Sequence, residues 1–392
     1  MIYANLPLGS AHGWGVVGRY VSRELSRLEP LRLITAPFDA IRVGDPLEFH
    51  ELQALALGEA EAAGFERAEG TRQLDGPLLQ AIADQTLVPM QPELRGTISV
   101  GYTFFEFNLL KPEWIAQGRR CFQRVATGSS WCTQILREAG LENTVTVLQG
   151  VDPTVFYPSP GREGEREFLA DKFVVFSGGK FELRKGQDIV IRAFKVLQDR
   201  HADVMLVTAW YNAWSSMESM SASPLIRLAP QTGPYTQVMG RILTDNGIDL
   251  RGVILALPQP TSAMARLYRN TDVGLFANRC EGGTNLVLME YMACGKPVVA
   301  VNTTGHADIV NSSNALIIGS KGATTINRRG QPAACWPEPD LDDAIAKLEW
   351  AYQNRESLHP LAQQAGRDLA RYTWRKTAES FQKLVHQTAG QS

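Results

Sequence analysis

The 392-residue sequence lacks the features that mark several special classes of protein. It has no apolar run close to the roughly 18 to 20 residues that cross a membrane. Its N-terminus has neither a basic stretch nor a long apolar core, so we expect no signal peptide. These absences predict a protein without a transmembrane segment that acts in the cytoplasm.

Cysteine and net charge are also low, and both exclude functions. The five cysteines form no C-x-x-C pair, and no His, Cys or carboxylate cluster has the spacing of metal ligands. The formal net charge is −2, and residues 1–150 carry more acidic than basic side chains. Such a chain does not attract nucleic acid electrostatically. We expect no metal site, no disulfide framework and no nucleic-acid partner.

Short apolar runs alternate with helical patterns, which is typical of an α/β protein with parallel sheets. At about 150 residues per domain, the length predicts two domains. Strands are predicted at residues 2–6, 31–35, 97–102, 124–127, 145–148, 173–176, 204–207, 253–257, 272–276 and 298–301. Helices are predicted at residues 16–28, 131–139, 187–200 and 341–386.

A stretch rich in proline, glycine and charge, residues 150–164, is predicted to be a linker. We therefore predict a first domain over residues 1–155, a second over 165–370 and a C-terminal segment over 371–392. Residues 209–240 show no clear periodicity and are predicted to be irregular. No motif of the P-loop type occurs, which argues against an NTPase.

One segment offers an anion site at the start of a short helix. Glu281-Gly282-Gly283-Thr284-Asn285 follows a predicted strand, and Thr284 or Asn285 can cap the helix that begins there. The amides of Leu286 and Val287 would then lack helical partners and point at a bound anion such as a diphosphate. Gly282 and Gly283 leave room for a ligand close to the backbone. Glu281 and Glu290 lie on either side of this site and can accept hydrogen bonds from sugar and ribose hydroxyls.

A second segment, Ser177 to Gly186, follows the first predicted strand of the second domain. It contains Gly179, Lys180 and Lys185. We predict that the two lysines converge on the diphosphate and stabilise the charge that develops on a leaving group. If each segment stood alone, solvated glutamates and loop lysines would be the simpler interpretation.

The two segments together resemble the family-4 retaining glycosyltransferases of the GT-B fold. The resemblance assigns Glu281 and the Gly282-Gly283 amides to the donor hexose, Leu286 and Val287 to the diphosphate, and Glu290 to the ribose. It places Gly179, Lys180 and Lys185 at the leaving phosphate. Two departures stand out: the glutamates are nine residues apart where eight is usual, and Lys180 replaces an arginine.

The resemblance implies two Rossmann-like domains that face an interdomain cleft, with the C-terminal helix packed back on the first domain. It also implies transfer of a hexose from a nucleoside-diphosphate sugar to an acceptor hydroxyl, with retention of configuration. Lys180, Lys185 and Glu281 would be catalytic, and Thr284 and Asn285 would belong to the substrate site. The donor is a co-substrate, no cofactor is expected, and the acceptor is a glycan, a lipid-linked molecule or a protein.

The first domain carries a rival motif. Gly13-Trp14-Gly15-Val16-Val17-Gly18 reads as G-x-G-x-x-G with Asp39 downstream, the pattern of an NAD-dependent oxidoreductase. The resemblance instead makes Gly13 and Gly15 part of a glycine-rich turn facing the donor. Glu106, after the strand at 97–102, and His12 are candidates for the acceptor side. A further alternative is a sugar-nucleotide-binding protein of the GT-B fold without catalytic activity.

Asp340-Leu341-Asp342 spells D-x-D, a motif found in metal sites. It directly precedes a predicted helix, so we interpret these aspartates as capping residues.

Overall fold

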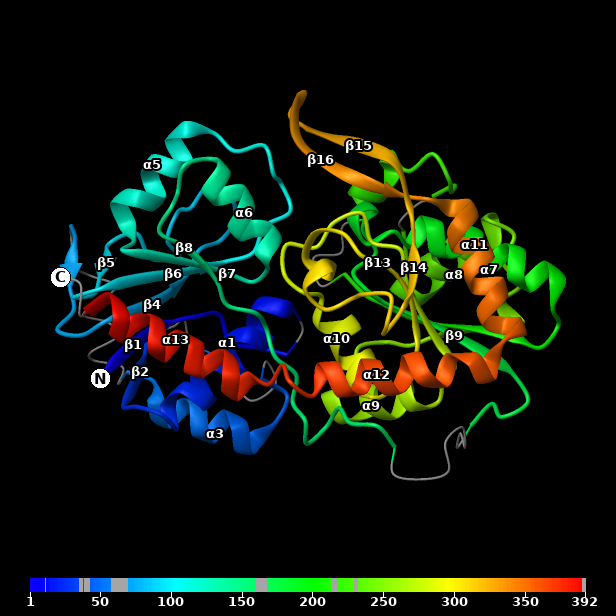
Figure 1. The fold of residues 1–392 in the computed structure, drawn as a ribbon, viewed down its shortest axis with the longest axis horizontal. Helices are drawn as coiled ribbons and strands as arrows, with labels where there is room; N and C mark the ends of the chain where they lie inside the picture. Colours follow the sequence, from blue (N-terminus) through cyan, green and yellow to red (C-terminus); the bar gives the residue numbers. More distant parts are fainter. Residues whose placement is uncertain are drawn as a thin grey trace.

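The computed structural model describes residues 1–10, 12–34, 38, 43–57, 70–159, 168–212, 217–228 and 232–389. Two domains lie side by side, each built on a six-stranded sheet with helices on both of its faces (Figure 1). All strand pairs within the two large sheets are parallel.

The first sheet has the order β2-β1-β4-β6-β7-β8. Its strands are β1 (Ile2–Asn5), β2 (Leu31–Leu33), β4 (Leu78–Ala81), β6 (Ser99–Thr103), β7 (Arg124–Thr127) and β8 (Thr144–Thr146). The helices of this domain are α1 (Gly13–Ser26), α3 (Pro46–Leu55), α5 (Pro112–Cys121) and α6 (Ser130–Glu138). The short strands β3 (Arg72–Gln73) and β5 (Leu94–Arg95) pair separately.

The second sheet has the order β11-β10-β9-β12-β13-β14. Its strands are β9 (Phe173–Gly179), β10 (Val204–Trp210), β11 (Val253–Leu255), β12 (Val273–Phe276), β13 (Val298–Val301) and β14 (Leu316–Ile318). The helices are α7 (Gln187–Arg200), α8 (Tyr235–Asp245), α9 (Thr261–Arg269), α10 (Leu286–Ala293), α11 (Leu341–Gln353) and α12 (His359–Leu369). Single-turn helices include η1 (Leu183–Lys185), η2 (Glu218–Ala222) and η4 (Thr304–Asp308).

Most of the predicted elements are confirmed, two predictions need correction, and some strands were not predicted. The predicted strands 124–127 and 298–301 and the helix 187–200 coincide with β7, β13 and α7. The predicted irregular segment 209–240 contains the end of β10, η2 and the start of α8. The predicted tail helix is divided into α11, α12 and a final α13 (Trp374–Ala389). β4, the third strand of the first sheet, was not predicted.

The last helix packs against the first domain. Trp374, at its start, stacks on Tyr20 of α1 with ring centroids 5.2 Å apart and planes nearly parallel. Phe381 meets the ring of Tyr102 edge-on at 5.0 Å. The chain therefore begins and ends in the same core, although residues 168–369 build the other domain.

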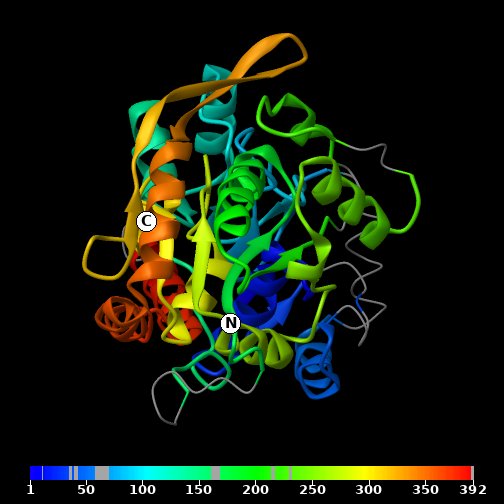
Figure 2. The same cartoon turned by 90° about the vertical axis from the view of Figure 1, so that its right-hand side faces the viewer.

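A long hairpin, β15 (Ser320–Arg328) and β16 (Gln331–Pro339), projects from the second domain. Its strands pair with each other and with neither large sheet. Figure 1 shows it leaning toward the first domain, and Figure 2 shows it rising above the body of the molecule. The Leu109 amide donates to the Ala333 carbonyl at 3.2 Å, and Asn108 makes two hydrogen bonds with the backbone of Cys335. This hairpin was not predicted.

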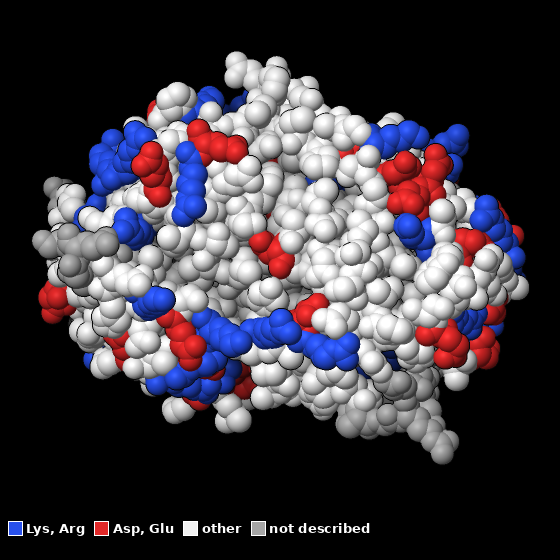
Figure 3. Space-filling view, viewed as in Figure 1, with Lys and Arg blue, Asp and Glu red and all other residues white. Residues whose placement is uncertain are grey.

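The surface agrees with the low net charge. On the face shown in Figure 3, acidic and basic side chains are interspersed over both domains. Among the described residues, no helix is long and apolar enough to span a bilayer. Asp340 caps α11 by accepting hydrogen bonds from the amides of Asp342 and Asp343, which confirms the capping interpretation of the D-x-D string.

We predict that Trp374→Ala destabilises the first domain by about 3–5 kcal/mol, because it removes a buried ring that stacks on Tyr20. Urea titration followed by circular dichroism measures the change. Trp350→Ala is the matched control, since Trp350 is 39% exposed, and we expect its effect to stay within about 0.5 kcal/mol. Equal effects of the two substitutions would show that α13 does not support the first domain.

Candidate functional site

A cavity of about 1180 Å³ lies between the two domains. The carboxyl ends of the parallel strands open into it, from β1, β4 and β6 on one side and from β9, β10, β11 and β12 on the other. Ligands of open α/β sheets bind at such strand ends. The predicted site residues that line it are Gly13, Glu106, Gly179, Lys180, Lys185, Glu281, Gly283, Asn285, Leu286, Val287 and Glu290.

The start of α10 faces this cavity as an anion site. Asn285 occupies the N-cap position, but its side chain makes no capping hydrogen bond. Its amide group instead contacts Nε2 of His306 at 3.1 Å. The amides of Leu286 and Val287 therefore receive no cap from Asn285 and remain oriented toward the cavity end of the helix, where the dipole favours an anion.

Thr284, which was predicted to belong to the substrate site, lies outside the cavity lining. Its backbone amide and its hydroxyl both donate to Oε1 of Gln149, at 3.3 and 3.1 Å. Thr284 is fully buried and is not among the residues that line the cavity. It contacts the first domain, so Asn285 and not Thr284 holds the cap position.

The two glycines after Glu281 make room for the first domain. A Cβ atom on Gly282 would lie 2.5 Å from the carbonyl oxygen of Phe105, and one on Gly283 would lie 2.8 Å from Gln149. The Gly282 carbonyl accepts a hydrogen bond from the Ser129 hydroxyl at 2.6 Å. The prediction that Gly282 leaves room for a ligand is therefore wrong, since protein backbone occupies that space.

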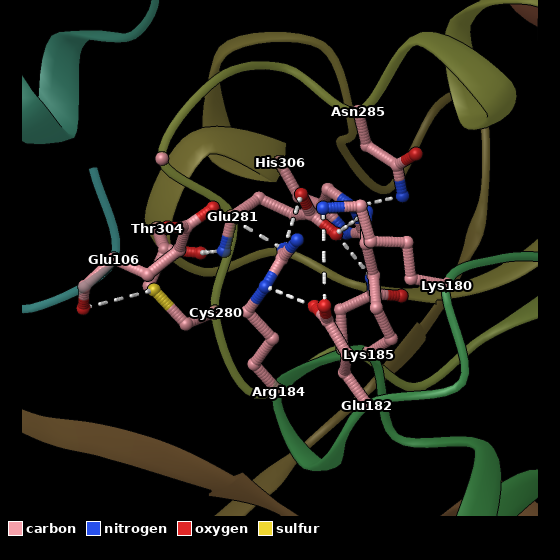
Figure 4. A network of polar contacts seen from close by, with 12 residues as sticks. Glu106, Lys180, Glu182, Arg184, Lys185, Cys280, Glu281, Asn285, Thr304 and His306 are labelled. Carbon is pink, nitrogen blue, oxygen red and sulfur yellow. Dashed lines mark hydrogen bonds and ion pairs between the residues drawn. The ribbon is translucent and has the colours of Figure 1, made fainter. Parts of the chain in front are cut away.

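A network of ion pairs lies beside the anion site (Figure 4). Lys185 Nζ contacts Glu281 Oε1 at 2.6 Å, and Arg184 Nη1 contacts Glu281 Oε2 at 3.3 Å. Lys180 Nζ lies 3.8 Å from Glu182. Lys180 and Lys185 thus line one cavity wall, where each faces a carboxylate.

Burial and charge act in opposite directions on Glu281. Burial alone would raise the pKa of this carboxyl, but Lys185 and Arg184 hold its pKa below the usual value. Burial is also the main reason that the pKa of Lys185 falls, against the attraction of Glu281. Glu281 is therefore an ionised acceptor inside the cavity wall, suited to hydrogen-bond donors such as hydroxyls.

A buried arginine fixes the loop that carries Glu281. The Arg279 guanidinium binds both carboxylate oxygens of Asp188 at 2.8 and 2.9 Å. It also binds both oxygens of Glu338, at the base of the hairpin, at 2.7 Å. The amides of Arg279 and Cys280 donate to the Arg184 carbonyl. One buried cation therefore joins the Glu281 loop, α7 and β16.

Glu290 lies on the other side of the anion site, one turn into α10. It accepts a hydrogen bond from the Tyr268 hydroxyl at 3.1 Å. Burial raises the pKa of Glu290 to about 8, while Tyr268 and Arg19 oppose the shift. This carboxyl is therefore largely protonated at neutral pH, and new hydrogen-bond donors from a ligand would favour its ionised form.

The glycine motif of the first domain does not form a dinucleotide loop. Gly13, Gly15 and Gly18 all lie within α1, and a Cβ on Gly15 or Gly18 would collide with the backbone of Gly9 or Pro7. Gly15 does not line the cavity. The NAD-dependent interpretation loses its geometric basis, and Asp39 lies outside the described residues.

His12 and Glu106, the acceptor-side candidates, have defined contacts. Nδ1 of His12 accepts a hydrogen bond from the Gly15 amide at 3.1 Å and caps α1. The Glu106 carboxylate lies 3.4 Å from Arg184 Nη1 across the cleft. Of the two, Glu106 presents its carboxylate at the junction of both domains.

Sequence reasoning missed Arg184, Arg279 and Gln149. Arg279 and Arg184 stand inside the two segments singled out, so their charge was visible, but their partners Asp188, Glu338 and Glu106 are distant in sequence. Gln149 gave no signal, because its role depends on the approach of Thr284 from the other domain. Among the described residues, no group of three or more His, Cys, Asp or Glu side chains could hold a metal ion.

Part of the chain is similar to known glycosyltransferases. Residues 171–327 match the family model described as glycosyl transferases group 1. The chain is 25% identical over 215 residues to a GDP-mannose-dependent alpha-(1-6)-phosphatidylinositol monomannoside mannosyltransferase of Mycolicibacterium smegmatis, covering 52% of this chain and 50% of the relative. It is 31% identical over 190 residues to D-inositol 3-phosphate glycosyltransferase 1 of Catenulispora acidiphila, covering 46% and 41%. The chain thus spans about half the length of the curated relatives it matches.

Solved structures match the whole chain. Sucrose-phosphate synthase from Thermosynechococcus elongatus superposes with a TM-score of 0.69 at 13% identity, covering 100% of this chain and 99% of that one. HepE from Anabaena, in complex with UDP-glucose, gives 0.65 at 13% identity with the same coverage. At this identity the likeness establishes the fold. The predicted GT-B fold and the resemblance to family-4-like glycosyltransferases are confirmed.

We predict that Gly282→Ala prevents full closure of the two domains, because the added methyl group would meet the Phe105 backbone at 2.5 Å. Small-angle scattering should give a larger radius of gyration, with little change in melting temperature. Gly240→Ala in α8 is the control, since its Cβ would meet only Leu250 at 3.7 Å. A variant as compact as the unsubstituted protein would contradict this account.

We predict that Glu290→Gln stabilises the protein increasingly as the pH rises from about 4.5 to about 8. The folded state holds a proton on Glu290 that the unfolded chain releases above its ordinary pKa, so the native protein loses stability across this window. Glutamine cannot ionise and avoids this loss. Melting temperatures over the pH series measure the difference, with Glu113→Gln as a surface control. A difference that does not grow with pH would refute the ionisation argument.

Proposed function

We propose that this chain, a GT-B protein with a group 1 glycosyltransferase domain, moves a hexose from a nucleoside-diphosphate sugar to an acceptor hydroxyl. The observation that carries the proposal is the meeting of three features in the interdomain cavity. These are the uncapped start of α10, the Lys185–Glu281 pair and the second carboxyl at Glu290. Each matches a different part of a sugar nucleotide.

The diphosphate would bind at the start of α10. The amides of Leu286 and Val287 supply backbone donors, while Lys180 and Lys185 supply positive charge. A diphosphate near Lys185 would compete with Glu281 for the ammonium group. This exchange would free the Glu281 carboxylate to accept hydrogen bonds from hydroxyls of the hexose, and Lys185 would stabilise the negative charge that grows on the leaving phosphate.

The ribose would lie against Glu290. Two ribose hydroxyls can donate to one carboxylate, which favours the ionised form of Glu290 that burial disfavours in the structure. Residues 256–259, which follow β11, line the same cavity beyond this point and are our candidate for the base-binding loop. The name of one curated relative includes GDP-mannose, and one solved structure of similar fold contains UDP-glucose. We therefore propose a nucleoside-diphosphate hexose as the donor and leave its base open.

The acceptor would enter from the first domain. Glu106, Asp84 and Gln85 follow neighbouring strands and line that wall of the cavity. Two matched relatives carry inositol in their names, which favours a polyhydroxylated acceptor such as a glycan or a lipid-linked polyol. We propose Glu106 as the carboxylate that orients the accepting hydroxyl.

Retention of configuration is part of this proposal and rests on the resemblance of residues 278–298 to retaining enzymes. We also propose that the two lysines and the α10 amides neutralise the leaving group without a metal ion, and that the enzyme acts in the cytoplasm. A sugar-nucleotide-binding protein without catalysis is the competing function. This alternative is motivated by the nine-residue spacing of Glu281 and Glu290. Release of nucleoside diphosphate from the donor distinguishes an active glycosyltransferase from a protein that only binds the donor.

We predict that Lys185→Ala lowers turnover by about 10²–10³-fold, because one fixed cation at the leaving group is lost. Release of nucleoside diphosphate from a panel of UDP- and GDP-hexoses, with and without polyol acceptors, measures this. Lys195→Ala, on the outer face of α7 and paired with Asp199, is the matched control and should retain full activity.

Two results would count against the proposal. Unchanged turnover in Lys185→Ala would remove Lys185 from the reaction. Tight binding of a sugar nucleotide without any release of nucleoside diphosphate would favour the non-catalytic alternative. The anomeric proton of the product, observed by NMR, reports retention or inversion directly.

A further inference from the structure

Arg184 occupies a position that the two recognised segments leave without a role. Its side chain is 15% exposed and lines the interdomain cavity. The same nitrogen, Nη1, lies 3.4 Å from Glu106 of the first domain and 3.3 Å from Glu281 of the second. One guanidinium group therefore stands between a carboxylate from each domain (Figure 4).

Several contacts hold Arg184 in this place. Its Nε donates toward Glu182 at 2.8 Å. Its backbone carbonyl accepts hydrogen bonds from the amides of Arg279 and Cys280 at 2.8 and 3.1 Å. The loop that carries Glu281 is therefore hydrogen-bonded to the residue whose side chain pairs with Glu281.

Glu106 is held toward the second domain by its backbone as well. Its carbonyl accepts a hydrogen bond from the indole of Trp336, in the hairpin, at 2.7 Å. The Cys280 thiol approaches the same carbonyl at 3.7 Å. Both anchors place the Glu106 carboxylate directly opposite Arg184.

We propose that Arg184 is a positioning residue that couples domain closure to the placement of Glu106 and Glu281. Its planar guanidinium group pairs with both carboxylates and holds them close together when the domains meet. Its role in glycosyl transfer rests on the proposed function, whereas its role in closure does not.

The charges around Arg184 show what its loss would do. The titratable and charged side chains that face it are Glu106, Glu182, Cys280, Glu281 and Lys185. His306 lies close enough to Glu281 to act on its charge. Without Arg184, Glu106 and Glu281 would confront each other across the interface, with Lys185 balancing only one of them. Like charges at short range repel, so the closed arrangement would become less favourable.

A direct role in phosphate binding makes different predictions. If Arg184 bound the diphosphate, its loss would weaken binding of nucleoside diphosphate and leave closure of the protein alone unchanged. If it positions the carboxylates, its loss would open the protein at neutral pH and leave that affinity within about threefold. The two roles therefore separate in measurements that do not depend on turnover.

The experiment compares Arg184→Gln, Arg184→Lys and the double variant Arg184→Gln with Glu106→Gln. Small-angle scattering at about pH 4 and about pH 8 reports closure, calorimetry reports the affinity for UDP and GDP, and melting curves verify folding at both pH values. Arg200→Gln is the matched control, because Arg200 is half exposed and pairs with Glu349 far from the cavity.

We expect Arg184→Gln to be more open than the unsubstituted protein at about pH 8 and to recover part of its compactness at about pH 4, where carboxyl groups with ordinary pKa values take up protons and the repulsion weakens. The double variant should be compact at both pH values, and Arg184→Lys should be intermediate. Turnover of Arg184→Gln should fall by about 100-fold, since misplaced groups react slowly.

Two outcomes would overturn the proposal: an Arg184→Gln variant as compact as the unsubstituted protein at both pH values, or a loss of nucleotide affinity beyond about tenfold with unchanged compactness. Absence of glycosyl transfer in the unsubstituted protein would refute the proposed function instead, and the scattering comparison would still decide the role of Arg184 in closure.

Discussion

The site depends on the direct contact between the Glu281–Asn285 turn and the first domain. At Gly282 the backbones approach so closely that a methyl group has no room. The Ser129 hydroxyl and the Gln149 side chain of the first domain also form hydrogen bonds with the turn. This contact brings residues from both sheets to one cavity. Without it, the start of α10, Lys185 and Glu281 would remain in the second domain, but Glu106 would not meet them.

Charge balance is the second constraint. Lys180, Arg184 and Lys185 lie among Glu106, Glu182 and Glu281, so cations and carboxylates near the start of α10 neutralise one another. A ligand bearing a diphosphate therefore has to replace existing partners. Such an exchange favours ligands that also offer hydroxyl donors to the displaced carboxylates, which is a chemical basis for preferring sugar nucleotides to simple phosphates.

The sequence predicted elements with local signals and missed those set by distant contacts. α7 and β13 combine clear periodicity with flanking glycine or proline, and their bounds were predicted correctly. β4 is four residues long and becomes a strand because β1 and β6 pair with it on both sides. The hairpin has an Arg329-Gly330 turn in the left-handed region, but its strands are mostly exposed and lack a regular alternation of apolar residues.

The same reasoning explains which site residues were predicted. Lys185, Glu281 and Glu290 stand in segments whose order of strand, turn and helix is local, so their meeting at one cavity could be anticipated. Gly282 could not be assigned correctly, because a glycine does not reveal whether ligand or protein fills the space beside it. Arg184 could not be recognised, because its significance comes from Glu106, 78 positions earlier in the printed sequence.

The hairpin forms part of the cavity wall but belongs to neither large sheet. Its strands satisfy each other's backbone hydrogen bonds, while Thr325, Asn327 and Arg328 face the cavity. Insertions or deletions near its tip would leave both cores intact. Changes at this point would therefore reshape one wall of the cavity without rebuilding either sheet.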